Sequence, residues 1–231
     1  MTAGLDILGV GLDIPPATDT RALCRSAGAD TREFRGWDNV CVAREDEHPS
    51  TMGAAALRAA LDDAAISPTD LGIVVSAGMS RDYLPSWSLS TEIMKAAGTG
   101  PAALGIDLTL GCLGTLAALN VAHGWLTGGG YAGIVTAERW AYTVDRSVTT
   151  TMTLWAHSDG AGALVVGLGT GDPALGVYQG GANCCRNSDQ QRVIPPHSDH
   201  GVRRCGGAGE ELSVRAGGLA LAAVECRTRA G

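Results

Sequence analysis

The stretch "DLTLGCLGTLAALNVAHGWLTGGG", Asp107–Gly130, sets a cysteine between two glycines, after an apolar run and before a segment rich in alanine and leucine. The apolar run at 104–110 is short and predicts a buried strand. Residues 113–127 contain no Asp, Glu, Lys or Arg and have apolar residues round most of a helix. Because such a helix is normally buried on nearly all sides, we expect the same of this one.

Further strands and one clear helix surround this stretch. The helix at 50–66 has Ser50 or Thr51 as its expected N-cap. One face of it gathers the apolar residues Met52, Ala56, Leu57, Ala60 and Leu61. Short runs rich in β-branched residues predict strands at 5–12, 71–78, 132–138 and 161–168. The alternation of strands and helices predicts an α/β fold with a largely parallel sheet.

Composition limits the classes of function. The chain has 231 residues, of which 45% are hydrophobic and 4% aromatic, and it contains 33 glycines. This predicts a soluble globule with a closely packed interior of small aliphatic side chains. A formal net charge of -7, with Lys95 as the only lysine, argues against nucleic acid as a partner.

The N-terminus and the cysteines bear on the compartment. The opening "MTAGLDILGVGLDIPP" has no basic segment before a long apolar core, and no apolar run reaches about 18 residues. We expect no membrane contact and a cytoplasmic protein. The 7 cysteines form no C-x-x-C pair, so we expect reduced thiols and no metal site.

The chain divides at about residue 170. Residues 1–170 hold every strand and helix predicted above. Residues 171–231 are polar and broken by proline and glycine, and we interpret them as an irregular loop followed by an incomplete further strand and helix.

Cys112 has two interpretations on residues alone. At the first turn of a helix, free N–H groups and the positive end of the helix dipole stabilise a thiolate, and flanking glycines leave room for a reacting group. A small apolar cysteine between glycines is equally compatible with a plain core position, and core positions are more common.

Five stretches in register weigh on this choice. They are "ILGVGLDIPP", "STMGAAALRAALDDAAISPTDLGIVVSAGMS", "LPSWSLSTEIMKAAG", "IDLTLGCLGTLAALNVAHGWLTGGGYAGIVTAE" and "SDGAGALVVG". Together they resemble the N-terminal half of the β-ketoacyl-ACP synthase III (ketosynthase III) branch of the thiolase superfamily. The resemblance implies a thiolase-like layered α/β fold, present as one half of the usual duplicated arrangement.

The resemblance implies an acyltransferase of fatty-acid or polyketide biosynthesis. In that family the cysteine matched by Cys112 takes an acyl group from a thioester, and its own backbone N–H helps to hold the oxyanion. The implied partners are acyl-CoA or an acyl carrier protein and a second copy in a homodimer, with no cofactor beyond the substrate. Asp159, in "SDGAGA", is more simply a residue that caps a tight turn.

The resemblance also suggests substrate contacts. The family's CoA-contacting tryptophan and arginine match Asp30 and Phe34 by count, so Trp37 and Arg35, which lie nearby, are the candidates here. This departure makes an acyl carrier protein a possible donor in place of CoA. Four apolar residues are candidates for an acyl pocket, although each also fits a plain core position: Leu84, Trp87, Leu113 and Leu116.

The family's catalysis also uses a histidine and an asparagine from the second half of the fold, and the segments that carry them are not found in this sequence. His123 lies eleven residues after Cys112, about 16 Å along a helix, beyond hydrogen-bond reach. His197 and His200 fall in the irregular segment, and His48 is expected at the surface. We therefore expect a truncated or degenerate second half. The alternative is a catalytically silent half that binds a partner ketosynthase or a carrier protein.

Overall fold

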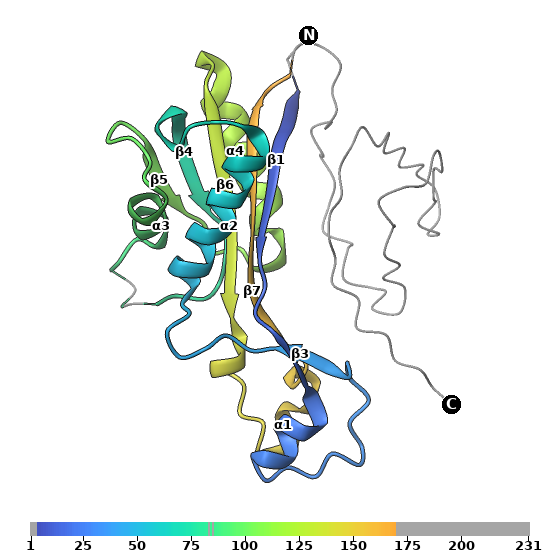
Figure 1. Ribbon diagram of the computed structural model, residues 1–231. Helices are drawn as coiled ribbons and strands as arrows, with labels where there is room; N and C mark the ends of the chain where they lie inside the picture. The colour runs from blue at the N-terminus through green and yellow to red at the C-terminus, as the bar shows by residue number, and fades with distance from the viewer. Residues whose placement is uncertain (1–3, 83, 85, 170–231) are drawn as a thin grey trace, which may run out of the picture.

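A five-stranded mixed sheet forms the centre of the protein (Figure 1). The computed structural model describes residues 4–82, 84 and 86–169; the segment 171–231, with His197 and His200, lies outside them. In the order in which they pair, the strands are β1 (Leu5–Asp13), β7 (Asp159–Leu168), β6 (Tyr131–Arg139), β4 (Leu71–Ser76) and β5 (Leu104–Asp107).

The direction of β7 departs from the sequence prediction. β4 pairs in parallel with β5 and β6, whereas β7 is antiparallel to both β6 and β1. The reason is the connection between β6 and β7, which begins and ends at the same edge of the sheet. The last residue of β6, Arg139, therefore pairs with the first residue of β7, Asp159. Without a helix that crosses the sheet, the two strands can only be antiparallel. The largely parallel sheet is therefore correct for β4, β5 and β6 and wrong for β7.

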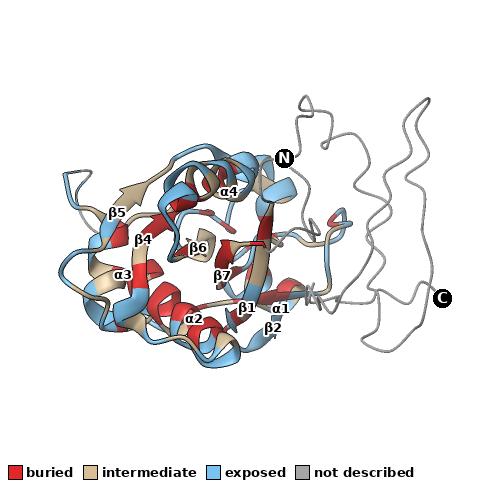
Figure 2. Cartoon of the chain, turned by 90° about the horizontal axis from the view of Figure 1, so that it is seen from above, coloured by how far each residue is buried: buried red, intermediate tan, exposed pale blue. Residues whose placement is uncertain are grey.

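Helices cover the two faces of the sheet (Figure 2). α2 (Pro49–Ala64) and α3 (Leu89–Ala97) lie on one face, where Leu57, Ile93 and Val135 belong to one apolar cluster. α4 (Gly114–Trp125) lies on the other, where Ala118 packs with Ile73. No helix in the described ranges is both long and apolar enough to cross a bilayer.

α2 confirms the predicted buried face and corrects the predicted start. Its five predicted core residues are all buried. The N-cap is His48, whose N–H donates to the Thr51 hydroxyl at 2.8 Å, and Ser50 and Thr51 lie inside the helix. The helix begins earlier in the sequence than predicted, at Pro49, because proline fits the first helical position, where its missing N–H costs nothing.

The backbone of β1 lies directly against α2. A Cβ atom on Gly11 would lie 2.0 Å from the Ala56 carbonyl oxygen, and one on Gly9 would lie 2.2 Å from that of Ala60. Both neighbours are backbone atoms inside a helix, so they cannot rotate away. The two glycines therefore set the distance between the sheet and its largest helix.

α4 is the main correction to the sequence prediction. Its buried residues are Gly114, Ala118 and Ala122, which form a single face. Leu116 and Trp125 are 45% and 48% exposed. The prediction of burial on nearly all sides assumed a layer on both sides of the helix, and no described element packs on its outer side.

A second small unit was not predicted from the sequence. It consists of β2 (Ala17–Asp19) paired with β3 (Asn39–Cys41), and of α1 (Thr20–Ser26), which Asp19 caps. Beneath it Phe34 packs on Trp155 with ring centroids 5.7 Å apart. These elements are too short for a hydrophobic period to show. α3 was also missed, although Leu89, Ile93 and Ala97 recur at helical spacing on its buried face.

We predict that Gly11→Ala lowers the free energy of unfolding by about 1–3 kcal/mol, because the added methyl meets helix backbone. Gly124→Ala is the matched control: no atom lies within 4 Å of its Cβ position, so alanine should stabilise α4 by up to about 1 kcal/mol. Urea denaturation followed by circular dichroism measures both. Equal stability of Gly11→Ala and the parent chain would contradict the close contact between β1 and α2.

Candidate functional site

The carboxyl ends of β4, β5 and β6 meet at one edge of the sheet, because these three strands run in the same direction. Side chains that follow such strands converge, and this edge is where α/β folds usually bind ligands. Cys112 lies in the turn that follows β5, a 3-10 segment at Gly111–Leu113 that leads directly into α4.

Each of the two flanking glycines has a distinct role in this turn. Gly111 has a φ of +55°, in the left-handed region that other residues rarely adopt. A Cβ atom on Gly114 would lie 2.8 Å from the Ala77 carbonyl oxygen, so the start of α4 sits tightly on the end of β4. The turn therefore needs glycine at both positions for reasons of backbone geometry.

Hydrogen bonds tie the turn and α4 to the sheet. The Asp107 carboxylate, at the end of β5, accepts from the N–H groups of Leu89 and Ser90 at 2.9 and 2.7 Å and so caps α3. The hydroxyl groups of Thr115, in the first turn of α4, and Thr136, in β6, lie 2.9 Å apart. Cys112 is thus carried by a turn with anchored ends.

Cys112 differs from the other two described cysteines in its exposure. Cys112 is exposed, whereas Cys24 and Cys41 are buried. Burial raises the pKa of the Cys24 thiol, which keeps that sulfur in its unreactive neutral form. Among the described residues, Cys112 is therefore a surface position and not part of the core. The remaining cysteines, Cys184, Cys185, Cys205 and Cys226, lie outside the described residues.

The four candidate pocket residues lie on the surface. Leu84 and Trp87, in the segment before α3, are 73% and 53% exposed, and Leu113 and Leu116 flank Cys112 with 45% of each exposed. None of the four belongs to the core formed by the described residues. Their role as an acyl pocket remains a prediction.

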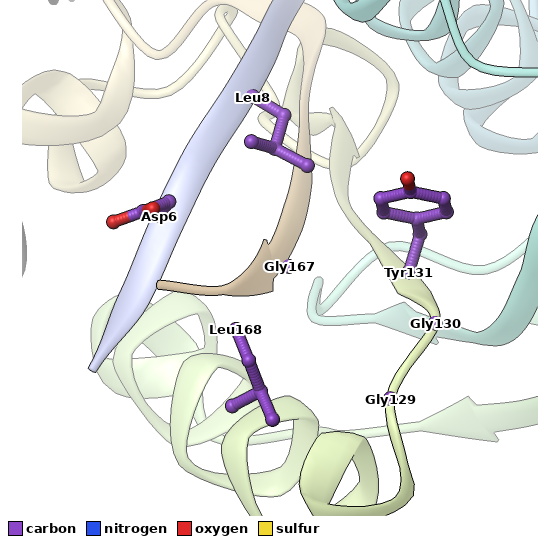
Figure 3. Close-up of a pocket in the computed structure, with 7 residues that line it drawn as sticks. All are labelled: Asp6, Leu8, Gly129, Gly130, Tyr131, Gly167 and Leu168. Atoms are coloured by element: carbon purple, nitrogen blue, oxygen red, sulfur yellow. The ribbon is translucent and has the colours of Figure 1, made fainter. Parts of the chain in front are cut away.

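Two shallow cavities lie elsewhere. One, of about 430 Å³, is lined by Asp6, Leu8, Tyr131 and the glycines beside Tyr131, at the end of β6 opposite its carboxyl end (Figure 3). The other is lined by residues of α1 and of the segment that follows β6, Arg146 among them. Neither contains a residue predicted for the site.

Trp37 and Arg35 lie in the segment between α1 and β3. Both are exposed, and the Arg35 guanidinium donates to the carbonyl oxygens of Arg32 and Phe34 at 2.7 and 3.2 Å. Of the two positions matched by count, Phe34 is a buried core residue. The other, Asp30, pairs with Arg32, which lowers the pKa of its carboxyl to about 2. The structure thus leaves contact between these residues and CoA as a prediction.

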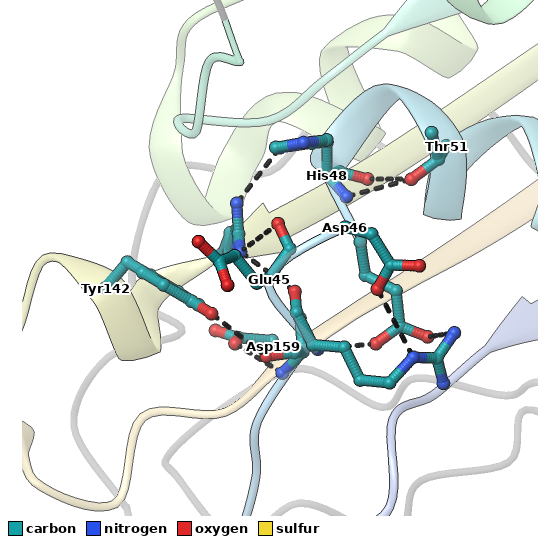
Figure 4. Close-up of polar contacts among 10 residues, drawn as sticks. Glu45, Asp46, His48, Thr51, Tyr142 and Asp159 are labelled. Carbon is teal, nitrogen blue, oxygen red and sulfur yellow. Dashed lines mark hydrogen bonds and ion pairs between the residues drawn. The ribbon is translucent and has the colours of Figure 1, made fainter.

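Asp159 is structural, but it begins strand β7 and binds distant backbone groups instead of capping a tight turn. Its buried carboxylate accepts from the N–H of Ala43 at 2.8 Å and from that of Ala141 at 2.7 Å (Figure 4). These two bonds attach the segment after β3 and the segment after β6 to the start of β7. Asp159 therefore holds together three parts of the chain that are distant in sequence.

The described histidines occupy other places. His48, expected at the surface, is half-buried at the start of α2, and its Nδ1 accepts from the Arg139 guanidinium at 3.0 Å (Figure 4). His157, which the sequence analysis did not single out, packs beside Trp140. His123 is half-buried in the last turn of α4. The described part of the chain holds no cluster of three or more side chains suited to bind a metal ion.

Comparison with known proteins agrees with this architecture. The family model for 3-oxoacyl-[acyl-carrier-protein (ACP)] synthase III matches residues 106–180. A β-ketoacyl-[acyl-carrier-protein] synthase III of Rhizorhabdus wittichii is 32% identical over 166 residues, which cover 69% of this chain and 51% of that protein. The protein of the same name from Aliarcobacter butzleri is 31% identical over 155 residues, covering 66% of this chain and 45% of that protein.

Solved structures show the same relationship. The priming β-ketosynthase of the R1128 polyketide biosynthetic pathway superimposes with a TM-score of 0.65 at 29% identity, over 73% of this chain and 51% of that chain. The chain is a ketosynthase III-like member of the thiolase superfamily. OleA of Xanthomonas campestris, at 19% identity and a TM-score of 0.64 over 72% of this chain and 57% of that chain, shares the fold.

The ketosynthase III-like chain spans about half the length of the relatives it matches. The fold prediction, a layered α/β unit equal to one half of the usual thiolase arrangement, is confirmed. The family model begins at Ile106, in β5, and so includes the turn that carries Cys112.

We predict that Cys112 is the first cysteine to react with an electrophile, because it is exposed at a helix start while Cys24 and Cys41 are buried. Limiting iodoacetamide followed by peptide mass analysis measures the order of labelling. Cys24 should react only after unfolding in urea. Preferential labelling of any other cysteine in the folded protein, with Cys112 untouched, would contradict the prediction.

Proposed function

We propose that this chain carries an acyl group as a thioester on Cys112 and acts as a ketosynthase III-like acyltransferase of fatty-acid or polyketide biosynthesis. The observation that carries the proposal is the exposed thiol at the start of α4, on the edge where three parallel strands end. The relatives named above support the class of reaction.

The acyl transfer is a thioester exchange. The Cys112 thiolate attacks the carbonyl carbon of the donor thioester and forms a tetrahedral oxyanion. The N–H of Cys112 and the positive end of α4 stabilise that charge. When the oxyanion collapses, the bond to the donor sulfur breaks. The donor leaves as a thiolate that takes up the proton released from Cys112, and the acyl group remains on the enzyme.

The proposed donor is acyl-CoA or an acyl carrier protein. Trp37 and Arg35 are exposed, and a donor that contacts Arg35 would compete with the carbonyl oxygens of Arg32 and Phe34 for its guanidinium. Phe34, by contrast, is buried against Trp155 and unavailable for that purpose. A donor therefore cannot contact the side chain at position 34. This favours an acyl carrier protein, because its acyl group can be delivered without a nucleotide contact there.

Condensation with a malonyl acceptor requires more catalytic groups than acylation of Cys112. It requires groups that stabilise the negative charge left by loss of carbon dioxide, which the family resemblance assigns to a histidine and an asparagine. His48 and His157, at the start of α2 and beside Trp140, have partners of their own. We therefore propose that the two half-reactions separate in this chain, with acylation retained and condensation dependent on a complete partner.

A second candidate function rests on α4. The helix carries no formal charge in its sequence, and Leu116, on its outer side, is 45% exposed among the described residues. An apolar side of this kind suits a protein partner. The alternative proposal is a catalytically silent unit that binds a partner ketosynthase or a carrier protein.

We predict that the chain slowly gains one acyl mass when it is mixed with a short-chain acyl-CoA, and that Cys112→Ala abolishes the gain. Cys24→Ala is the matched control and should leave the gain unchanged, because Cys24 is buried. Whole-protein mass spectrometry measures both variants. With malonyl-carrier protein added, no β-ketoacyl product should form until a complete family member is supplied.

Formation of product by the chain alone would overturn the separation of the two half-reactions. Absence of any acyl adduct with both acyl-CoA and acyl carrier protein would instead support the silent binding unit.

We further propose a homodimer that forms through β5. β5 is an edge strand of the sheet, and its first residue, Leu104, is 40% exposed. Pairing of two such edges across a two-fold axis satisfies backbone groups that otherwise face water.

Leu104→Lys should shift the protein toward monomer in light scattering, because it replaces an exposed apolar side chain on the edge strand with a charged one, which disfavours pairing of edges. Leu8→Lys, on the opposite edge strand, is the control. Equal masses for the parent chain and both variants, all monomeric at every concentration, would exclude the dimer.

A further inference from the structure

The segment after β4 is fixed to its neighbours by side-chain carboxylates. Glu138, near the end of β6, accepts from the N–H groups of Met79 and Ser80 at 2.7 and 3.0 Å and from the Ser80 hydroxyl at 2.7 Å. Asp82 accepts from the N–H of Ser50, in the first turn of α2, at 3.0 Å. Residues 79–82 are therefore held from two sides of the carboxyl edge.

Arg81 extends this fixed segment to the turn that carries Cys112. Its Nη1 donates to the carbonyl oxygens of Gly78 and Ser80 at 3.2 and 3.1 Å. Its Nη2 donates to the hydroxyl of Thr109 at 2.5 Å. Thr109 lies three residues before Cys112. One guanidinium thus joins the anchored segment to the approach of the candidate nucleophile.

The approach to Cys112 needs such a contact. The N–H of Leu108 donates to the Ser76 carbonyl oxygen at 2.8 Å, beyond the last paired residue of β5, and the first bond of the following turn is from the N–H of Leu113 to the Leu110 carbonyl oxygen, at 3.3 Å. Between them the chain passes through Thr109 and Leu110, both exposed, and the left-handed Gly111. The Arg81 bond holds the chain within this interval.

We infer that Arg81 is a positioning residue for Cys112, acting through Thr109, with Glu138 as the anchor of its segment. Arg81 does not need to touch the substrate in this role. It fixes where the turn begins, and so whether the sulfur lies over the N–H groups at the start of α4 that favour its anionic form. Its importance for acyl transfer rests on the proposed function, whereas its effect on the reactivity of Cys112 does not.

Paired substitutions at Thr109 test the bond with the least disturbance. Thr109→Val keeps the shape and removes the hydroxyl, and Thr109→Ser keeps the hydroxyl. We expect iodoacetamide to alkylate Cys112 about threefold to tenfold more slowly in Thr109→Val, the factor that corresponds to the net contribution of one ordinary hydrogen bond. Thr109→Ser should keep the rate of the parent chain.

A double-mutant cycle assigns the effect to the Arg81–Thr109 pair. Arg81→Met should slow alkylation at least as much as Thr109→Val, and the double variant should be no slower than Arg81→Met alone. Two controls should keep the parent rate: Arg58→Met, which loses a bond to the Ala96 carbonyl oxygen, and Thr127→Val, at the far end of α4. Additive effects, or equal rates for Thr109→Val and Thr109→Ser, would overturn the inference.

Labelling of Cys24 separates positioning from general destabilisation. Because Cys24 is buried, its alkylation reports opening of the folded chain. The inference requires a Cys24 rate that is unchanged in Thr109→Val, and a Cys24 rate that rises in that variant would assign the effect to overall stability. Acyl uptake from acyl-CoA is then measured on the same variants. If neither the parent chain nor any variant takes up acyl groups, the proposed function is wrong. The alkylation rates then still decide whether Arg81 positions Cys112.

Discussion

The parallel pairing of β4 with both β5 and β6 is the constraint on which the rest of the structure depends. It brings three strand ends to one edge, where β5 supplies Asp107 and the turn with Cys112, β6 supplies Glu138, and β4 leads into the segment with Arg81. Asp107 caps α3, Glu138 anchors the segment after β4, and the turn after β5 presents Cys112. If β5 ran in the other direction, Asp107 and Cys112 would lie at the edge of the sheet opposite Glu138 and the segment after β4.

Close backbone contacts between helices and strands fix the position of this edge. Gly11 brings β1 against α2, and Gly114 brings α4 against the end of β4, so that two helices approach the sheet more closely than side chains would permit. The candidate site itself holds no large buried side chain. Its geometry comes from glycines and from carboxylates that accept backbone N–H groups, which suits a turn that must remain open to a second molecule.

The sequence predicted the longer elements and missed several short ones, among them α3, although Leu89, Ile93 and Ala97 recur at helical spacing in it. The apolar face of α2 was visible because Met52, Leu57 and Leu61 recur at helical spacing. α1, β2 and β3 were missed because a few residues cannot show a period. The antiparallel direction of β7 was also hidden, since it depends on where the connection after Arg139 leads and not on the composition of the strand.

The candidate site shows a similar division. Cys112 and its glycines were identified from local sequence. The partners that hold the turn, Arg81 and Glu138, were not, because they lie about thirty residues before and after Cys112 and meet only when the sheet forms. The burial of Phe34 was equally invisible, since its partner Trp155 belongs to the connection between β6 and β7. Long-range contacts of this kind leave no periodic signal in a single sequence.

The uncharged outer side of α4 has a consequence for how the protein behaves in solution. Attraction between molecules through that side has no charges to screen, so simple salts at moderate concentration should leave it unchanged. Hydrophobic attraction weakens on cooling and strengthens in sulfate. Cold, low-sulfate buffers therefore favour dispersed molecules, and warming is the condition under which this helix would draw them together.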